Sequence, residues 1–101
     1  MVTPQDYTAY HIMKAIGGDR ISAREIAERY NRWALRSGNP IMNVQRASLL
    51  IAKRLSPTYV EVAGVEHPWV KRGYRGRKIY ALTAVGHRWV ERYAHRWEEE
   101  D

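Results

Sequence analysis

The chain has 101 residues, which is the size of a single domain, and it contains no cysteine. The lack of cysteine excludes disulfides, thiol catalysis and zinc sites built on cysteine ligands. The formal net charge of +6 favours polyanionic partners over positively charged ones. Residues 1–18 show no apolar block behind a basic start, and no apolar run reaches membrane-spanning length. An intracellular protein without membrane association is therefore expected.

Arginine dominates the basic residues, with thirteen arginines against four lysines. Asparagine and glutamine together total five, and a low content of thermolabile residues is one trait of thermophile proteins. A GC-rich genome produces the same arginine bias. The composition therefore fits a thermophilic source without requiring one.

Two helices are predicted in the first third of the chain, over residues 4–16 and 23–36. A proline at the first helical position begins the first helix, and a glycine pair ends it. Ser22 and Glu25 form a capping box before the second helix. In both segments apolar residues recur three and four positions apart, which is typical of one face of a helix.

A third helix is predicted to begin near residues 40–43 and to end before the Ser56-Pro57 pair. Its inward face is predicted to consist of Val44, Ala47, Ser48, Ile51 and Leu55. Its outward face would carry Gln45, Arg46, Leu49 and Lys53. A leucine among outward, hydrogen-bonding side chains indicates a contact surface, unless it covers a neighbouring loop.

A β-hairpin is predicted next, with strands over residues 58–63 and 77–83. The loop between them and the start of the return strand are dense in cations, namely Lys71, Arg72, Arg75, Arg77 and Lys78. Cations gathered on one exposed loop repel each other, and the phosphates of a polyanion would neutralise them. The alternative is a hairpin tip that only water contacts.

The last predicted helix covers residues 84–98 and carries a stripe of large apolar side chains four positions apart. The stripe consists of Val85, Trp89, Tyr93 and Trp97. It is predicted to pack either on the first helix of the same chain or on a second copy. The acidic residues 98–101 that follow are expected to be a solvated end.

Two segments resemble a known group of proteins. Residues 22–55 resemble a helix-turn-helix, and residues 77–86, RKIYALTAVG, resemble the end of the wing in small archaeal and archaeal-virus winged-helix regulators. These regulators are similar to the MarR and PadR groups. The resemblance implies an α+β, mostly helical fold over residues 1–101: a winged helix-turn-helix with a three-helix core, a two-stranded β-wing and a C-terminal helix. It also implies transcription regulation, and pairing of two copies through terminal helices.

Catalytic and metal-binding patterns are missing from the sequence. His87 and His95 are eight positions apart, too far to share one ion, and no acid stands at a ligand spacing beside them. The glycines lack the spacing of a phosphate-binding loop, and no serine has a supporting histidine and aspartate context. We therefore expect neither an enzyme nor a cofactor, and no small-molecule effector is identifiable.

Binding of double-stranded DNA has a clearer physical basis. Gln45 is suited to adenine edges, Arg46 to guanine and Leu49 to a thymine methyl group. Other side chains would contact phosphates, or, for Tyr74 with one loop arginine, the minor groove. The full predicted DNA-binding set is Arg24, Gln45, Arg46, Leu49, Lys53, Arg54, Lys71, Arg72, Tyr74, Arg75, Arg77 and Lys78.

The sequence thus predicts a homodimeric, sequence-specific DNA-binding protein that regulates transcription. The alternative is a winged-helix module of an RNA or protein assembly. It is suggested by residues 72–77, which resemble the arginine–glycine segments of RNA binders. Tyr74 would then stack on an unpaired base.

Overall fold

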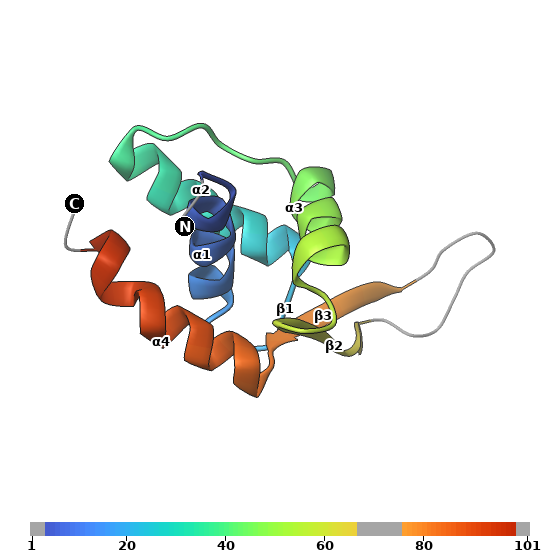
Figure 1. The fold of residues 1–101 in the computed structure, drawn as a ribbon. Coiled ribbons are helices and arrows are strands. Elements are labelled where there is room, and N and C mark those ends of the chain that lie inside the picture. The colour runs from blue at the N-terminus through green and yellow to red at the C-terminus, as the bar shows by residue number, and fades with distance from the viewer. Residues whose placement is uncertain (1–3, 67–75, 99–101) are drawn as a thin grey trace.

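The computed structural model describes residues 4–66 and 76–98, which form an α+β, mostly helical arrangement (Figure 1). Side chains are described over residues 7–65 and 76–94. The elements in chain order are α1 (Pro4–Ile16), β1 (Ile21–Ser22), α2 (Ala23–Ser37), α3 (Val44–Leu50), the π-helical turn η1 (Ile51–Leu55), β2 (Val60–Glu66), β3 (Arg77–Leu82) and α4 (Ala84–Glu98).

The predicted first, second and last helices are confirmed, and capping side chains mark where two of them begin. The Ser22 hydroxyl accepts a hydrogen bond from the backbone N–H of Glu25 at 3.4 Å, at the start of α2. Gly38 ends α2 in a left-handed conformation, with φ of 73°. The Thr83 hydroxyl accepts from the N–H of Gly86 at 3.0 Å, at the start of α4.

The third helix is divided into two parts. α3 begins at Val44, later than predicted, after Asn43 caps the N–H of Arg46 at 2.8 Å. The following turn, η1, is widened to π-helical geometry, and its end is marked by a bond from the N–H of Ser56 to the carbonyl of Ile51 at 2.7 Å. The sequence pattern did not predict this widening.

The predicted inward face of the third helix is correct at three positions and wrong at one. Ala47, Ile51 and Leu55 are buried, and Ser48 is half-buried. Val44 is 41% exposed, because the first turn of α3 extends beyond the core and faces a surface cavity instead.

The predicted hairpin is present as the antiparallel pair β2–β3, but the described residues contain a three-stranded sheet in the order β1-β3-β2, and the sequence did not predict the third strand, β1. β1 has only two residues, too few to show an alternating pattern. β2 continues to Glu66, beyond the predicted end at residue 63, because a bulge between Val62 and Gly64 interrupts its alternation.

The core lies between α1, α2, the inner side of α3 and η1, and the sheet. Its fully buried large side chains are Tyr10, Ile12, Met13, Ile16, Ile26, Ile51 and Val60. α4 runs along the opposite side of α1 from α3 (Figure 1), and the Trp89 ring closes this side. Its centroid lies 6.3 Å from that of Tyr10 and 6.1 Å from that of Tyr59. None of the helices within the described ranges has the length and hydrophobicity needed to span a bilayer.

The start of α4 is joined closely to the turn before β2. The Tyr59 carbonyl accepts a hydrogen bond from the N–H of Thr83 at 3.0 Å, and the Thr83 hydroxyl donates to the carbonyl of Thr58 at 2.6 Å. Gly86 packs directly on this turn, and a Cβ atom at this position would overlap the Tyr59 carbonyl oxygen. Glycine is therefore required at position 86 by close approach of two backbones.

We predict that Gly86→Ala destabilises the protein by about 3 kcal/mol, the upper part of the range for an overpacked site, because neither backbone can move without breaking these bonds. Gly18→Ala is the matched control, since a Cβ at Gly18 meets no atom within 4 Å. Urea denaturation of the wild type and both variants measures the difference. Equal destabilisation by the two substitutions would contradict the prediction.

Candidate nucleic-acid interface

The outward face of α3 and η1 is exposed, as predicted. Gln45, Arg46, Leu49 and Lys53 are all exposed, and Leu49 has 48% of its surface accessible. A leucine this exposed on a short helix offers apolar contact to a partner. This face therefore presents hydrogen-bonding, cationic and apolar side chains together.

The segment between α2 and α3 is held to α2 by one side chain, Asn31. Its amide nitrogen donates to the carbonyl of Met42 at 2.8 Å, and its amide oxygen accepts from the N–H of Met42 at 2.7 Å. Met42 itself is buried in the core. This reciprocal pair holds the connection between the two helices, so the exposed face of α3 is displayed from a fixed support.

The hairpin extends from the same side of the molecule as α3 (Figure 1). Arg77 and Lys78, the first two residues of β3, are exposed at its base. Of the other predicted hairpin contacts, Lys71, Arg72, Tyr74 and Arg75 lie outside the described residues.

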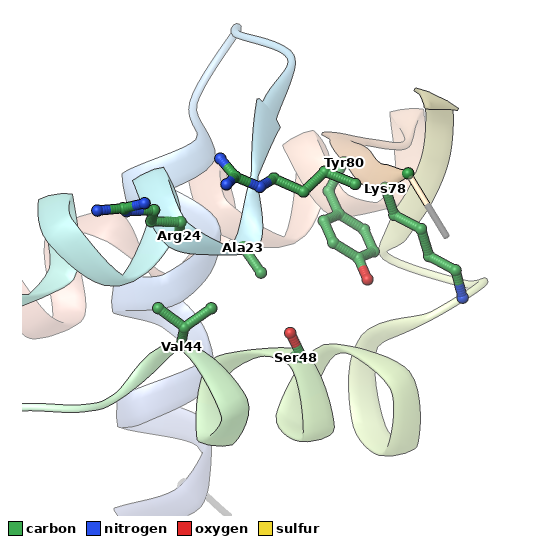
Figure 2. A pocket seen from close by; sticks show the side chains of 8 residues that line it. Ala23, Arg24, Val44, Ser48, Lys78 and Tyr80 are labelled. Atoms are coloured by element: carbon green, nitrogen blue, oxygen red, sulfur yellow. The ribbon is translucent and has the colours of Figure 1, made fainter. Parts of the chain in front are cut away.

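A cavity of about 480 Å³ lies between the first turn of α2, α3 and β3 (Figure 2). It is lined by Ala23, Arg24, Val44, Ser48, Gly76, Arg77, Lys78 and Tyr80. The lining brings together three predicted DNA-binding residues, Arg24, Arg77 and Lys78, from segments more than fifty positions apart. It also connects the inner edge of α3 to the base of the hairpin.

Ser48 and Tyr80 belong to this cavity, although the sequence did not identify them as site residues. The helical period placed Ser48 on the inward face, and Tyr80 was only part of an alternating strand. Tyr80 lies on the central strand, opposite Ile21 on one side and Val62 on the other. Burial raises the pKa of the Tyr80 phenol, which further favours the protonated hydroxyl, a hydrogen-bond donor.

The charges around the cavity are mostly uncompensated. Arg24 lies 3.6 Å from Glu28, but both side chains are 63% exposed, and such surface pairs contribute little. Within the described residues, Lys53, Arg77 and Lys78 take part in no ion pair. Arg54, also predicted to contact DNA, is exposed on η1. Lys53, Arg77 and Lys78 are thus available to an anionic partner.

Part of the predicted dimerisation stripe on α4 packs within the chain. Trp89 is half-buried against Tyr10 and Tyr59 of the same chain, and the Tyr93 ring lies 4.8 Å from that of Trp89. Val85 is 40% exposed. Trp97 lies in the last turn of α4, where side chains are outside the described part of the chain.

A second cavity, of about 170 Å³, is lined by His11, Lys14, Ala15, Arg29, Tyr30, Trp33 and Arg36. Its most enclosed cation, Arg29, already binds Asp19 at 2.8 Å and Glu25 at 3.4 Å. The hydrogen bond to Asp19, together with the nearby Glu25, raises the pKa of Arg29. Arg29 therefore stays protonated, and the two carboxylates compensate its positive charge. In the described ranges, no group of three or more histidine, aspartate or glutamate side chains is placed to hold a metal ion.

Comparisons with protein-family models, with curated proteins and with solved structures found no match for this chain.

Proposed function

We propose that this chain is a winged helix-turn-helix protein that binds double-stranded DNA inside the cell and regulates transcription. The observation that carries the proposal is the shared cavity, because it joins the inner edge of α3, beside the exposed face of that helix, to the cationic base of the hairpin. In a winged helix that binds DNA, the helix corresponding to α3 enters the major groove. The hairpin is the wing, which contacts the DNA backbone beside that groove. The α2–α3 pair would be the helix-turn-helix.

Each exposed side chain then has a role set by its chemistry. Gln45 and Arg46 in the first turn of α3 would hydrogen-bond to base edges, and Leu49 would contact a thymine methyl group. The cations at 53, 54, 77 and 78 would contact phosphates, which orient the protein without specifying sequence. The net charge of +6 supports the same partner.

We predict that Arg77→Ala with Lys78→Ala weakens binding to all duplex sequences alike. If each cation contacts one phosphate, the slope of log affinity against log salt becomes shallower by about 1.8, at roughly 0.9 for each phosphate. A salt titration of binding to one duplex measures the slope.

The matched control is Arg32→Ala with Arg36→Ala, which removes the same charge from two exposed positions in the second half of α2. Its slope should stay close to that of the wild type. Equal slopes for all three proteins would remove the wing from the interface. Tighter binding of structured RNA than of duplex DNA at matched salt would favour the RNA-binding alternative.

Base readout by α3 gives a separate prediction. Arg46→Ala should relax the preference at one base pair by about 1–3 kcal/mol, because a guanine contact is lost. Selection from randomised duplexes measures the preference, and Arg32→Ala serves as the equal-charge control. An unchanged preference in Arg46→Ala would mean that this residue does not read bases.

We further propose that two copies associate through α4. Val85 is exposed at the start of the stripe, while Trp89 already packs within the chain, so Val85 tests association with less risk to the fold. Val85→Glu should convert a dimer to a monomer in sedimentation equilibrium. Leu35→Glu, at a position 73% exposed on α2, should leave the dimer intact. A monomeric wild type at micromolar concentration would refute the association.

A further inference from the structure

We propose that the cavity between α2, α3 and β3 binds one phosphate group of the DNA backbone, with the hydroxyls of Tyr80 and Ser48 as hydrogen-bond donors. The inference rests on the proposed function and adds two neutral contact residues to it. It also gives the cavity a specific ligand, a phosphodiester between α3 and the wing.

Tyr80 carries the inference because it is a buried polar side chain without an internal partner. Only 7% of its surface is exposed, yet its hydroxyl makes no hydrogen bond within the described residues. Figure 2 shows its ring extending from β3 toward α3, with the hydroxyl at the tip inside the cavity. The Tyr80 hydroxyl is accessible from the open cavity, where a ligand oxygen can accept its hydrogen bond in place of water.

Ser48 offers a second hydroxyl from the opposite wall. It is half-buried on α3, and its side chain likewise makes no hydrogen bond within the described part of the chain. Figure 2 shows its oxygen directed from the helix into the space that Tyr80 enters. Many helical serines bond back to the preceding turn, and Ser37 does so to Trp33 at 2.8 Å, so the different orientation of Ser48 leaves its hydroxyl available.

The electrostatic surroundings select an anion. The lining contains three cationic residues, Arg24, Arg77 and Lys78, and no acidic residue. The N-terminus of α2, a helix of fifteen residues, also borders the cavity, and its dipole favours negative charge. Cations with neutral hydroxyl donors suit the oxygens of a phosphate. The volume of about 480 Å³ accommodates this group together with water.

The test is Tyr80→Phe, which removes the hydroxyl and keeps the ring that fills the wall. Duplex affinity should fall by about tenfold, as expected for a lost hydrogen bond to a charged group. The slope of log affinity against log salt should stay unchanged, because no charge is removed. Ser48→Ala should show the same pattern, and thermal melting of both variants checks that the fold is intact.

Duplexes with a single neutral methylphosphonate identify the phosphate involved. At the position that occupies the cavity, the wild type should lose affinity, and Tyr80→Phe should cause no further loss. At every other position, the tenfold difference between the two proteins should persist. A difference that persists at all positions would mean that Tyr80 does not contact a phosphate.

The outcomes separate this inference from the proposed function. If the wild type and Tyr80→Phe bind duplex DNA equally well, the phosphate site is refuted and DNA binding stands. If the wild type does not bind duplex DNA, the proposed function fails, and inorganic phosphate becomes the probe. Shifts of the Ser48 and Tyr80 amide resonances in the wild type, weakened in Tyr80→Phe, would support a site for free phosphate. No shift would refute it.

Discussion

The pairing of Ile21 and Ser22 with the centre of β3 is the constraint on which the rest of the structure depends. Ser22 lies opposite Ile79 as the last residue of β1, and its hydroxyl also caps α2. One residue therefore fixes the start of α2 against the sheet. This contact places the helical layer beside the hairpin, and it forms the wall that α2 contributes to the cavity. Asn31, just past the middle of α2, then holds the connection that leads into α3.

Local signals in the sequence were sufficient to predict the helices. Capping residues such as Ser22 and Thr83 act within three positions, so their effect is visible in a short stretch of sequence. The sheet was harder to predict, since β1 owes its extended form to a partner some sixty positions away. The bulge after Val62 broke the alternation that would have indicated a longer β2. Both errors come from contacts between distant segments.

The residues of the candidate site likewise fall into two groups, those predictable from the local sequence and those that depend on contacts between distant segments. The exposure of Gln45, Arg46 and Leu49 follows from the helical period alone, and the structure agrees with it. Ser48 and Tyr80 acquire their importance only when α3 and β3 are brought together, because neither side chain is unusual in its own segment. The stripe of α4 was predicted to pack either on α1 or on a second copy, and Trp89 is engaged within the chain by Tyr10 of α1 and by Tyr59. Periodicity identifies a face but not what covers it.

The widened turn η1 has a consequence for comparing this chain with others. A π-helical turn contains one residue more than an α-helical turn, and residues 52–54 are exposed between the buried anchors Ile51 and Leu55. Loss of one residue here would restore a regular helix and leave both anchors in the core. A chain of this architecture with a regular α-helix at this turn would be one residue shorter there. An alignment of the two chains anchored on residues 80–86 would then need a gap at η1 to superpose α3.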